Sequence, residues 1–151
     1  MYKIIKYKKQ LLKLTRNRLT SVKIMEKLPL NIQKFMPLIQ QRIVQGSSAF
    51  SEIIERLEKE LNEIPQQEQS EMVYAHFFYG GCDWFVLSWD RENEIIFCYV
   101  ILNGDVEMSE LGDVWLPELC NSKRIELDFY WDKKSLAQAK YEKYPNYFPK
   151  P

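Results

Sequence analysis

The sequence predicts an α+β domain in which N-terminal helices pack on an antiparallel sheet of about five strands. Two observations indicate this class. Apolar residues recur every three or four positions from Phe50 to Ile64, and from Met72 onward they alternate or form short runs. With 151 residues, 46% of them hydrophobic, the chain is long enough to bury one core. We therefore expect a single domain over residues 1–151.

Residues 1–48 are predicted to form a basic helical arm. Short helices are expected over residues 8–18 and from Thr20 to about Leu28. Pro37 suits the first turn of a helix and Gly46 its C-terminal end, so a further helix is expected from Pro37 to Gln45.

The clearest predicted helix runs from Ala49 to Glu63, within an amphipathic segment over residues 49–65. Ser47 or Ser48 provides the N-terminal cap, and Pro65 ends the helix. One apolar stripe at spacings of three and four predicts its buried face: Phe50, Ile53, Ile54, Leu57, Leu61 and Ile64.

The sheet is predicted over residues 72–132. Turn signals at Gly80-Gly81, 90–94 and 103–105 separate its first strands. The expected strands are Val73–Tyr79, Trp84–Trp89, Ile95–Leu102, a short one near 113–116, and Ile125–Trp131 with one apolar and one polar face. A helical turn is expected from Pro117. Residues 133–151 are predicted to hold a short helix, from Ser135 to Tyr144, and a Pro-rich tail.

The cysteines and the apolar runs predict a cytoplasmic protein. Cys82, Cys98 and Cys120 form no Cys-x-x-Cys pair and are odd in number, which favours reduced thiols. The longest apolar run, Ile95–Leu102, is far shorter than the roughly 20 residues that span a bilayer. The lysines near the N-terminus interrupt any signal-peptide core.

Opposite charges are segregated along the chain, although they sum to zero. Residues 1–48 hold eleven Lys/Arg and one acid (+10), residues 49–132 hold five Lys/Arg and nineteen acids (−14), and residues 133–151 hold five lysines and one acid (+4). Such a layout produces a surface field and indicates a charged partner or docking within the chain.

Two charged surfaces are candidate binding sites. The acidic one is the predicted sheet face, with Asp90, Glu110, Asp113, Glu126 and Asp128. Clustered carboxylates can also bind Mg²⁺ or perform acid–base chemistry, but solvated acids on a half-exposed sheet are the commoner case. The basic one is the arm, where phosphate neutralisation would use Lys8, Lys9, Lys13, Arg16 and Arg18.

The lone histidine, His76, offers a nucleophilic Cys–His alternative with Cys82, six residues away across the glycine turn. A partly buried strand histidine beside a turn thiol is the commoner case. The strand aromatics are expected in the core rather than as a stacking platform for bases. We predict no catalytic residue, metal or cofactor.

The C-terminal half resembles the domain-of-unknown-function family 2958 over about residues 72–138. The resemblance is carried by Tyr74-Ala75-His76-Phe77-Phe78, Trp84-Phe85-Val86-Leu87 with Asp90, Ile96-Phe97, Glu110-Leu111-Gly112, Glu118-Leu119 and Ile125-Glu126-Leu127-Asp128. It implies a small bacterial protein of a plasmid, phage or integrated element, and it implies no mechanism.

These observations together predict a small accessory protein that binds another macromolecule. A protein partner with a basic surface is expected on the acidic face, as for an anti-defence inhibitor. Nucleic acid bound through residues 1–48 is the first alternative, and an enzyme with an acidic or Cys–His site is the second. The sequence predicts neither the oligomeric state nor the identity of the partner.

Overall fold

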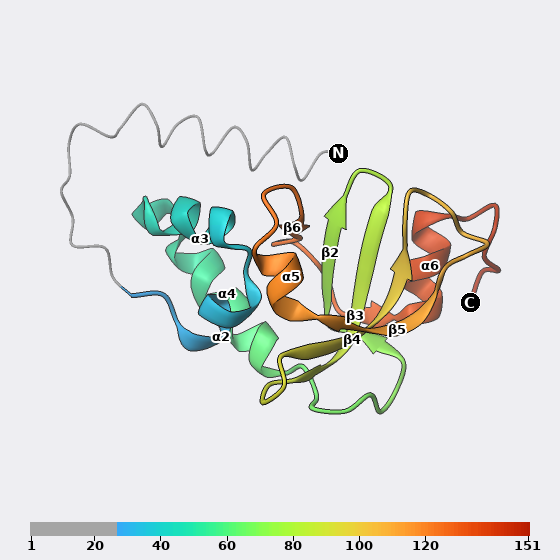
Figure 1. Cartoon of the computed structure of the whole chain (residues 1–151), viewed down its shortest axis with the longest axis horizontal. Helices are drawn as coiled ribbons and strands as arrows, with labels where there is room; N and C mark the ends of the chain where they lie inside the picture. The colour runs from blue at the N-terminus through green and yellow to red at the C-terminus, as the bar shows by residue number, and fades with distance from the viewer. Residues whose placement is uncertain (1–26) are drawn as a thin grey trace.

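The computed structural model describes residues 27–151 and confirms the α+β class. Helices on one side and α6 (Leu136–Lys143) on the other enclose an antiparallel sheet, which gives three layers (Figure 1). The five strands lie in the order β5-β4-β3-β2-β6. Their bounds are Ala75–Tyr79 for β2, Cys82–Asp90 for β3, Ile95–Ile101 for β4, Glu110–Trp115 for β5 and Glu126–Leu127 for β6.

The helical layer contains α2 (Leu30–Phe35), α3 (Leu38–Gln45), the 3-10 turn η1 (Ser48–Phe50) and α4 (Ser51–Asn62). The helix expected after Pro37 is confirmed as α3, and the amphipathic helix as η1 and α4 together. The backbone N–H of Ala49 donates to Ser47 Oγ at 3.1 Å, so Ser47 is the cap, as one of the two predicted serines.

The described part of the predicted basic helical arm is helical and packs into the core. Residues 30–45 form α2 and α3, whose side chains Ile32, Phe35 and Val44 are buried in the core. Helix α2 was not predicted, because it spans only six residues and has no side-chain cap. The helix predicted over residues 8–18 and nearly all of the next one lie outside the described residues.

Strands β2 to β5 form consecutive antiparallel hairpins, as the turn signals predicted. In the first turn, Gly80 has a φ of 53°, a conformation that glycine adopts without strain. Tyr79 pairs with Cys82 across this turn, which fixes the register so that His76 faces Phe85. The predicted strand near 113–116 is longer than expected and begins at Glu110. The expected helical turn is α5 (Leu116–Cys120).

Of the strand predicted from Ile125 to Trp131, only β6 (Glu126–Leu127) is present, and the prediction was wrong beyond it. The strand β6 covers Glu126 and Leu127, and the N–H of Asp128 still donates to the carbonyl of His76 at 2.8 Å. Asp128 then starts a turn in which its Oδ1 accepts the N–H of Tyr130 at 2.9 Å. The chain then forms β7 (Lys134–Ser135), which pairs with β1 (Met72–Val73), and continues into α6.

Each sheet face has its own core. On the helical side, Phe35 packs between Phe77 and Trp89, with ring centroids 5.1 and 5.0 Å apart. On the other side, α6 covers the middle of the sheet with Leu136 and Ala139, against Phe85, Leu87, Tyr99 and Ile101. Burial of apolar surface on both faces is what holds the three layers together.

Arg91 connects the helical layer to the sheet. Its guanidinium donates to the carbonyls of Leu61 and Ile64 near the end of α4, at 3.3 and 3.0 Å, and to that of Trp89 at 3.3 Å. It also lies over the Trp89 ring, 4.4 Å from the centroid. These bonds tie the end of α4 and the residues just after it to the end of β3.

Candidate functional site

The five predicted acids do not form one cluster, because strand order separates them. Glu110 and Asp113 lie on β5, at one edge of the sheet. Glu126 lies on β6 at the opposite edge, with Asp128 just after it. Four steps of roughly 4.8 Å between neighbouring strands separate the two edges by about 19 Å. A shared site for metal binding or acid–base catalysis is therefore not assembled from these acids.

Asp90, at the end of β3, caps the turn that follows it. Its carboxylate accepts from the N–H of Asn93 at 3.2 Å, from Asn93 Nδ2 at 2.8 Å and from Gln66 Nε2 at 2.9 Å. The bond from the Asn93 side chain is the main reason why the pKa of Asp90 is lowered. Within residues 27–151, no group of three or more His, Cys, Asp and Glu side chains is arranged to hold a metal ion.

The Cys82–His76 pair does not form either. Cys82 packs with the core of the helical side, as do Trp84 and Val86 at alternate positions of β3. His76 faces Phe85, which belongs to the opposite side of the sheet. Because successive strand side chains point to opposite faces, the thiol and the imidazole are separated by the sheet itself.

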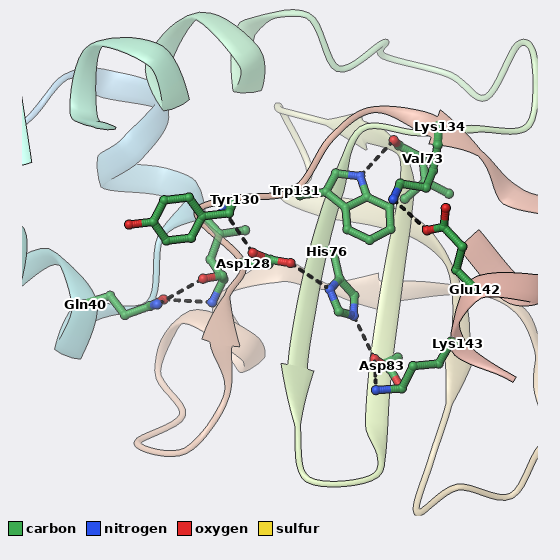
Figure 2. Close-up of polar contacts among 11 residues, drawn as sticks. Gln40, Val73, His76, Asp83, Asp128, Tyr130, Trp131, Lys134, Glu142 and Lys143 are labelled. Atoms are coloured by element: carbon green, nitrogen blue, oxygen red, sulfur yellow. Dashed lines mark hydrogen bonds and ion pairs between the residues drawn. The ribbon is translucent and has the colours of Figure 1, made fainter. Parts of the chain in front are cut away.

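His76 instead belongs to a buried polar cluster on the α6 side of the sheet (Figure 2). Its Nε2 lies 2.7 Å from Oδ1 of Asp83, whose side chain is fully buried. Its Nδ1 lies 3.6 Å from Oδ2 of Asp128. Lys143, in the last turn of α6, places its Nζ 3.6 Å from the same Asp83 oxygen. The cluster thus joins β2, β3, the turn after β6 and α6.

Aromatic rings enclose the His76 imidazole. Phe85 stacks on it with a centroid distance of 4.9 Å and Phe78 with one of 5.6 Å. The Trp131 ring lies 5.0 Å away, and its Nε1–H donates to the carbonyl of Val73 at 3.1 Å (Figure 2). These contacts keep solvent from the contact between His76 and Asp83, where electrostatic interactions are stronger than they are in water.

The Nε2 of His76 is within hydrogen-bonding distance of Asp83, and its buried Nδ1 lies 3.6 Å from Asp128 without a hydrogen bond to it. A general base needs one nitrogen within hydrogen-bonding reach of the proton that it removes. The geometry is that of a structural cluster that positions the turn at Asp128 and the end of α6. Within residues 27–151, the structure therefore assembles neither the acidic site nor the Cys82–His76 site that the enzyme alternative named.

The outer edges of the two terminal strands differ. The edge of β6 is covered, because the side chain of Gln40 bonds to the backbone N–H and C=O of Leu127. Among residues 27–151, no hydrogen bond reaches the outer edge of β5. An edge strand of this kind presents unpaired backbone groups to a possible partner.

The surface around β5 is acidic and partly apolar. Residues 92–122 contain seven acids and neither Lys nor Arg. All seven are exposed: Glu92, Glu94, Asp105, Glu107, Glu110, Asp113 and Glu118. Met108, Leu111 and Trp115 are also exposed, at 75%, 45% and 58%. We call this surface, made by residues 92–118 around β5, the acidic edge.

The acidic edge was only partly predicted. Two of its residues, Glu110 and Asp113, were among the five predicted acids, whereas Glu126 and Asp128 belong to the other edge. The signal that would have found it is the absence of Lys and Arg over 31 consecutive residues, from 92 to 122. The predicted basic binding residues, Lys8, Lys9, Lys13, Arg16 and Arg18, lie outside the described residues.

Comparison with known proteins identifies no family for this chain: no family model matches it, and no curated protein or solved structure proved similar to it. The resemblance to family 2958 therefore stays a prediction. Among the helices within residues 27–151, none is both long enough and apolar enough to cross a bilayer.

Proposed function

We propose that the protein is a small accessory protein that acts by binding a protein partner with a basic surface, and that the acidic edge is its binding surface. The observation that carries this proposal is the coincidence of an open edge strand with seven exposed acids in a stretch, residues 92–122, that contains neither Lys nor Arg. A concentration of charge of one sign raises the rate of encounter with an oppositely charged partner and disfavours others.

The exposed apolar residues support a binding surface rather than a merely solvated one. Trp115 and Leu111 lie on the same face of β5 as Asp113, because they alternate along the strand. Aromatic and aliphatic anchors surrounded by charge are typical of protein interfaces, where the anchors provide affinity and the charges provide selectivity.

The resemblance to family 2958 supplies the biological setting of the proposal. A protein of a bacterial plasmid, phage or integrated element would act in the cytoplasm, where host defence proteins hold nucleic acid on basic surfaces. An acidic protein that covers such a surface competes with the phosphate backbone for the same lysines and arginines. An anti-defence inhibitor of this kind is the role that we propose.

The test compares the protein with two charge-neutralised variants. The first, Glu107→Gln/Glu110→Gln/Asp113→Asn, removes charge from the acidic edge. The second, Glu52→Gln/Glu55→Gln/Glu63→Gln, removes the same charge from exposed positions in and just after α4 and is the control. All three are immobilised and exposed to bacterial lysate. Any partner is then purified and its binding measured by calorimetry at several salt concentrations.

The proposal expects a basic partner that binds the wild-type protein and the control, that is lost with the acidic-edge variant, and whose affinity falls as salt rises. A partner that binds all three proteins equally would place the interface elsewhere. Retardation of DNA or RNA that disappears when Lys8, Lys9, Lys13, Arg16 and Arg18 are neutralised would instead favour the nucleic-acid alternative.

A further inference from the structure

We propose that the partner binds by adding an extended segment to β5 as a further antiparallel strand, and that this segment carries lysine or arginine between apolar residues. This inference rests on the proposed function and specifies how the acidic edge is recognised. Strand addition obtains its affinity from main-chain hydrogen bonds and its specificity from alternate side chains.

The backbone of β5 has the hydrogen-bonding groups that such a strand needs. The N–H of Leu116 donates to the carbonyl of Glu94 at 2.8 Å, one position beyond the pair formed by Trp115 and Ile95. Because hydrogen-bonded and non-hydrogen-bonded pairs alternate in an antiparallel ladder, Val114, Gly112 and Glu110 bond to β4. The N–H and C=O groups of the intervening residues, Leu111, Asp113 and Trp115, therefore point away from the sheet.

The side chains of the same three residues determine which side chains fit one face of the incoming strand. Leu111, Asp113 and Trp115 pair with Tyr99, Phe97 and Ile95, so their side chains lie on the α6 side of the sheet. Helix α6 does not cover β5, and Leu111 and Trp115 stay 45% and 58% exposed. A matching strand has apolar residues opposite Leu111 and Trp115 and a cation opposite Asp113, since directly opposed side chains form the stabilising pairs.

The other face of β5 adds two further preferences. Glu110 is exposed and favours a second cation on the incoming strand. Gly112 leaves open space, because a Cβ built on it would meet no atom within 4 Å. A large aromatic side chain opposite this glycine can lie across it and bury the exposed backbone. The expected segment therefore runs antiparallel to β5, from the position opposite Trp115 to the position opposite Glu110. Along it, the residues are in turn apolar, small, basic, aromatic, apolar and basic.

A second copy of this chain is a poorer occupant of the same edge. If two β5 strands paired with each other, the acids of one copy would face the acids of the other. Residues 92–122 contain no Lys or Arg to offset that repulsion. Like charges placed opposite each other destabilise a strand pair. The charge of the acidic edge therefore favours a basic segment of a different protein.

The direct test uses a synthetic peptide, acetyl-Ile-Thr-Lys-Phe-Ile-Lys-amide, which places its first lysine opposite Asp113 and its phenylalanine opposite Gly112. Binding to ¹⁵N-labelled full-length protein is followed by amide chemical shifts and amide hydrogen exchange. We expect shifts confined to β5 and its neighbours, and slower exchange of the amides of Leu111, Asp113 and Trp115. A scrambled peptide of the same composition is the control.

Two variants make the test specific to the mode of binding. Asp113→Pro removes an outward N–H while leaving the bonds between β4 and β5 in place, and proline is accepted on edge strands. It should abolish peptide binding without unfolding the protein, as checked by circular dichroism. Asp113→Lys should lower the affinity for the peptide by roughly tenfold. A peptide with Glu in place of its first Lys should bind the Asp113→Lys variant with the lost affinity restored.

The outcomes separate this inference from the proposed function. If a basic partner recovered from lysate depends on the acidic edge but binds Asp113→Pro unchanged, strand addition is wrong and the proposed function stands. If neither the peptide nor a lysate protein depends on the acidic edge, both are overturned. Peptide shifts centred on α4, or dimerisation of the protein through β5 in light scattering, would likewise overturn strand addition of a basic segment.

Discussion

Gln40 of α3 bonds to Leu127 of β6 in the way that a neighbouring strand would. Its Nε2 donates to the carbonyl of Leu127 at 3.1 Å, while the N–H of Leu127 donates to its Oε1 at 2.8 Å. One amide side chain thus replaces one residue of a strand, since it offers a donor and an acceptor in the same arrangement as the backbone. Gln40 therefore closes the sheet at β6. Within residues 27–151, no side chain closes the sheet in the same way at β5.

Replacing Gln40 with leucine should destabilise the protein by about 2–4 kcal/mol, because it leaves a buried N–H and a buried C=O of Leu127 without partners. The measurement is the free energy of unfolding from urea titration. Gln45→Leu is the matched control, since Gln45 lies on the same helix, half-buried rather than buried. Equal stability of the two variants would show that the bonds to Leu127 contribute nothing.

His76 and Asp83 should be energetically coupled. Each single substitution, His76→Gln or Asp83→Asn, removes the contact of 2.7 Å. The free energy of unfolding of the double variant should therefore fall by less than the sum of the losses in the two single variants. A coupling free energy of about 1–3 kcal/mol is expected from a double-mutant cycle. The control cycle combines His76→Gln with Asp90→Asn, which share no contact, and additive losses are expected there. Additivity in both cycles would contradict the cluster.

The lowered pKa of Asp90 gives stability a specific pH dependence. Because hydrogen bonds lower the pKa of Asp90 in the folded protein below its ordinary value of 3.8, Asp90 stabilises the fold above pH 3.8. This contribution is lost as the pH falls through the folded pKa. Carboxyl carbon NMR titration measures the shift. Asn93→Ala should move the pKa of Asp90 back toward 3.8, since the Asn93 side chain is its main cause, whereas Asn146→Ala should not.

The three thiols should differ in reactivity. Burial raises the pKa of Cys120 to about 12 and raises that of Cys98 above its usual range, so both are protonated at pH 8 and shielded from reagent. Cys82 is half-buried. A disulfide exchange reagent should therefore modify one thiol quickly in the native protein and three in urea. Cys82→Ser should remove the fast phase, and a fast phase that persisted would contradict the described burial.

Local patterns in the sequence were sufficient to predict most elements. The stripe from Phe50 to Ile64 predicted α4, and alternation bounded by Gly80-Gly81 predicted β2 and β3. The pattern failed after Leu127, where alternation continues but Asp128 bonds to the backbone of its own turn. Side-chain bonding of this kind competes with strand pairing and leaves the alternation of apolar residues unchanged.

The arrangement of the site needed information that local patterns lack. Each strand's faces follow from its alternation, but strand order does not, so acids on β5 and β6 were assigned to one surface. The contact between His76 and Asp83 could have been predicted from the sequence. A two-residue glycine turn sets His76 opposite Phe85, and Asp83 is then the diagonal neighbour on the same face.

The connectivity of the sheet has a consequence for how the chain is made. Strands β2 to β5 are neighbours in sequence, whereas Phe77 of β2 pairs with Leu127, fifty residues later. Loop closure over that distance comes late in folding and, on the ribosome, only after residue 127 has been synthesised. Until then the apolar strand β2 is itself an open edge. A nascent chain that stops before β6 is thus exposed to misassembly at the strand which the finished protein keeps inside its sheet.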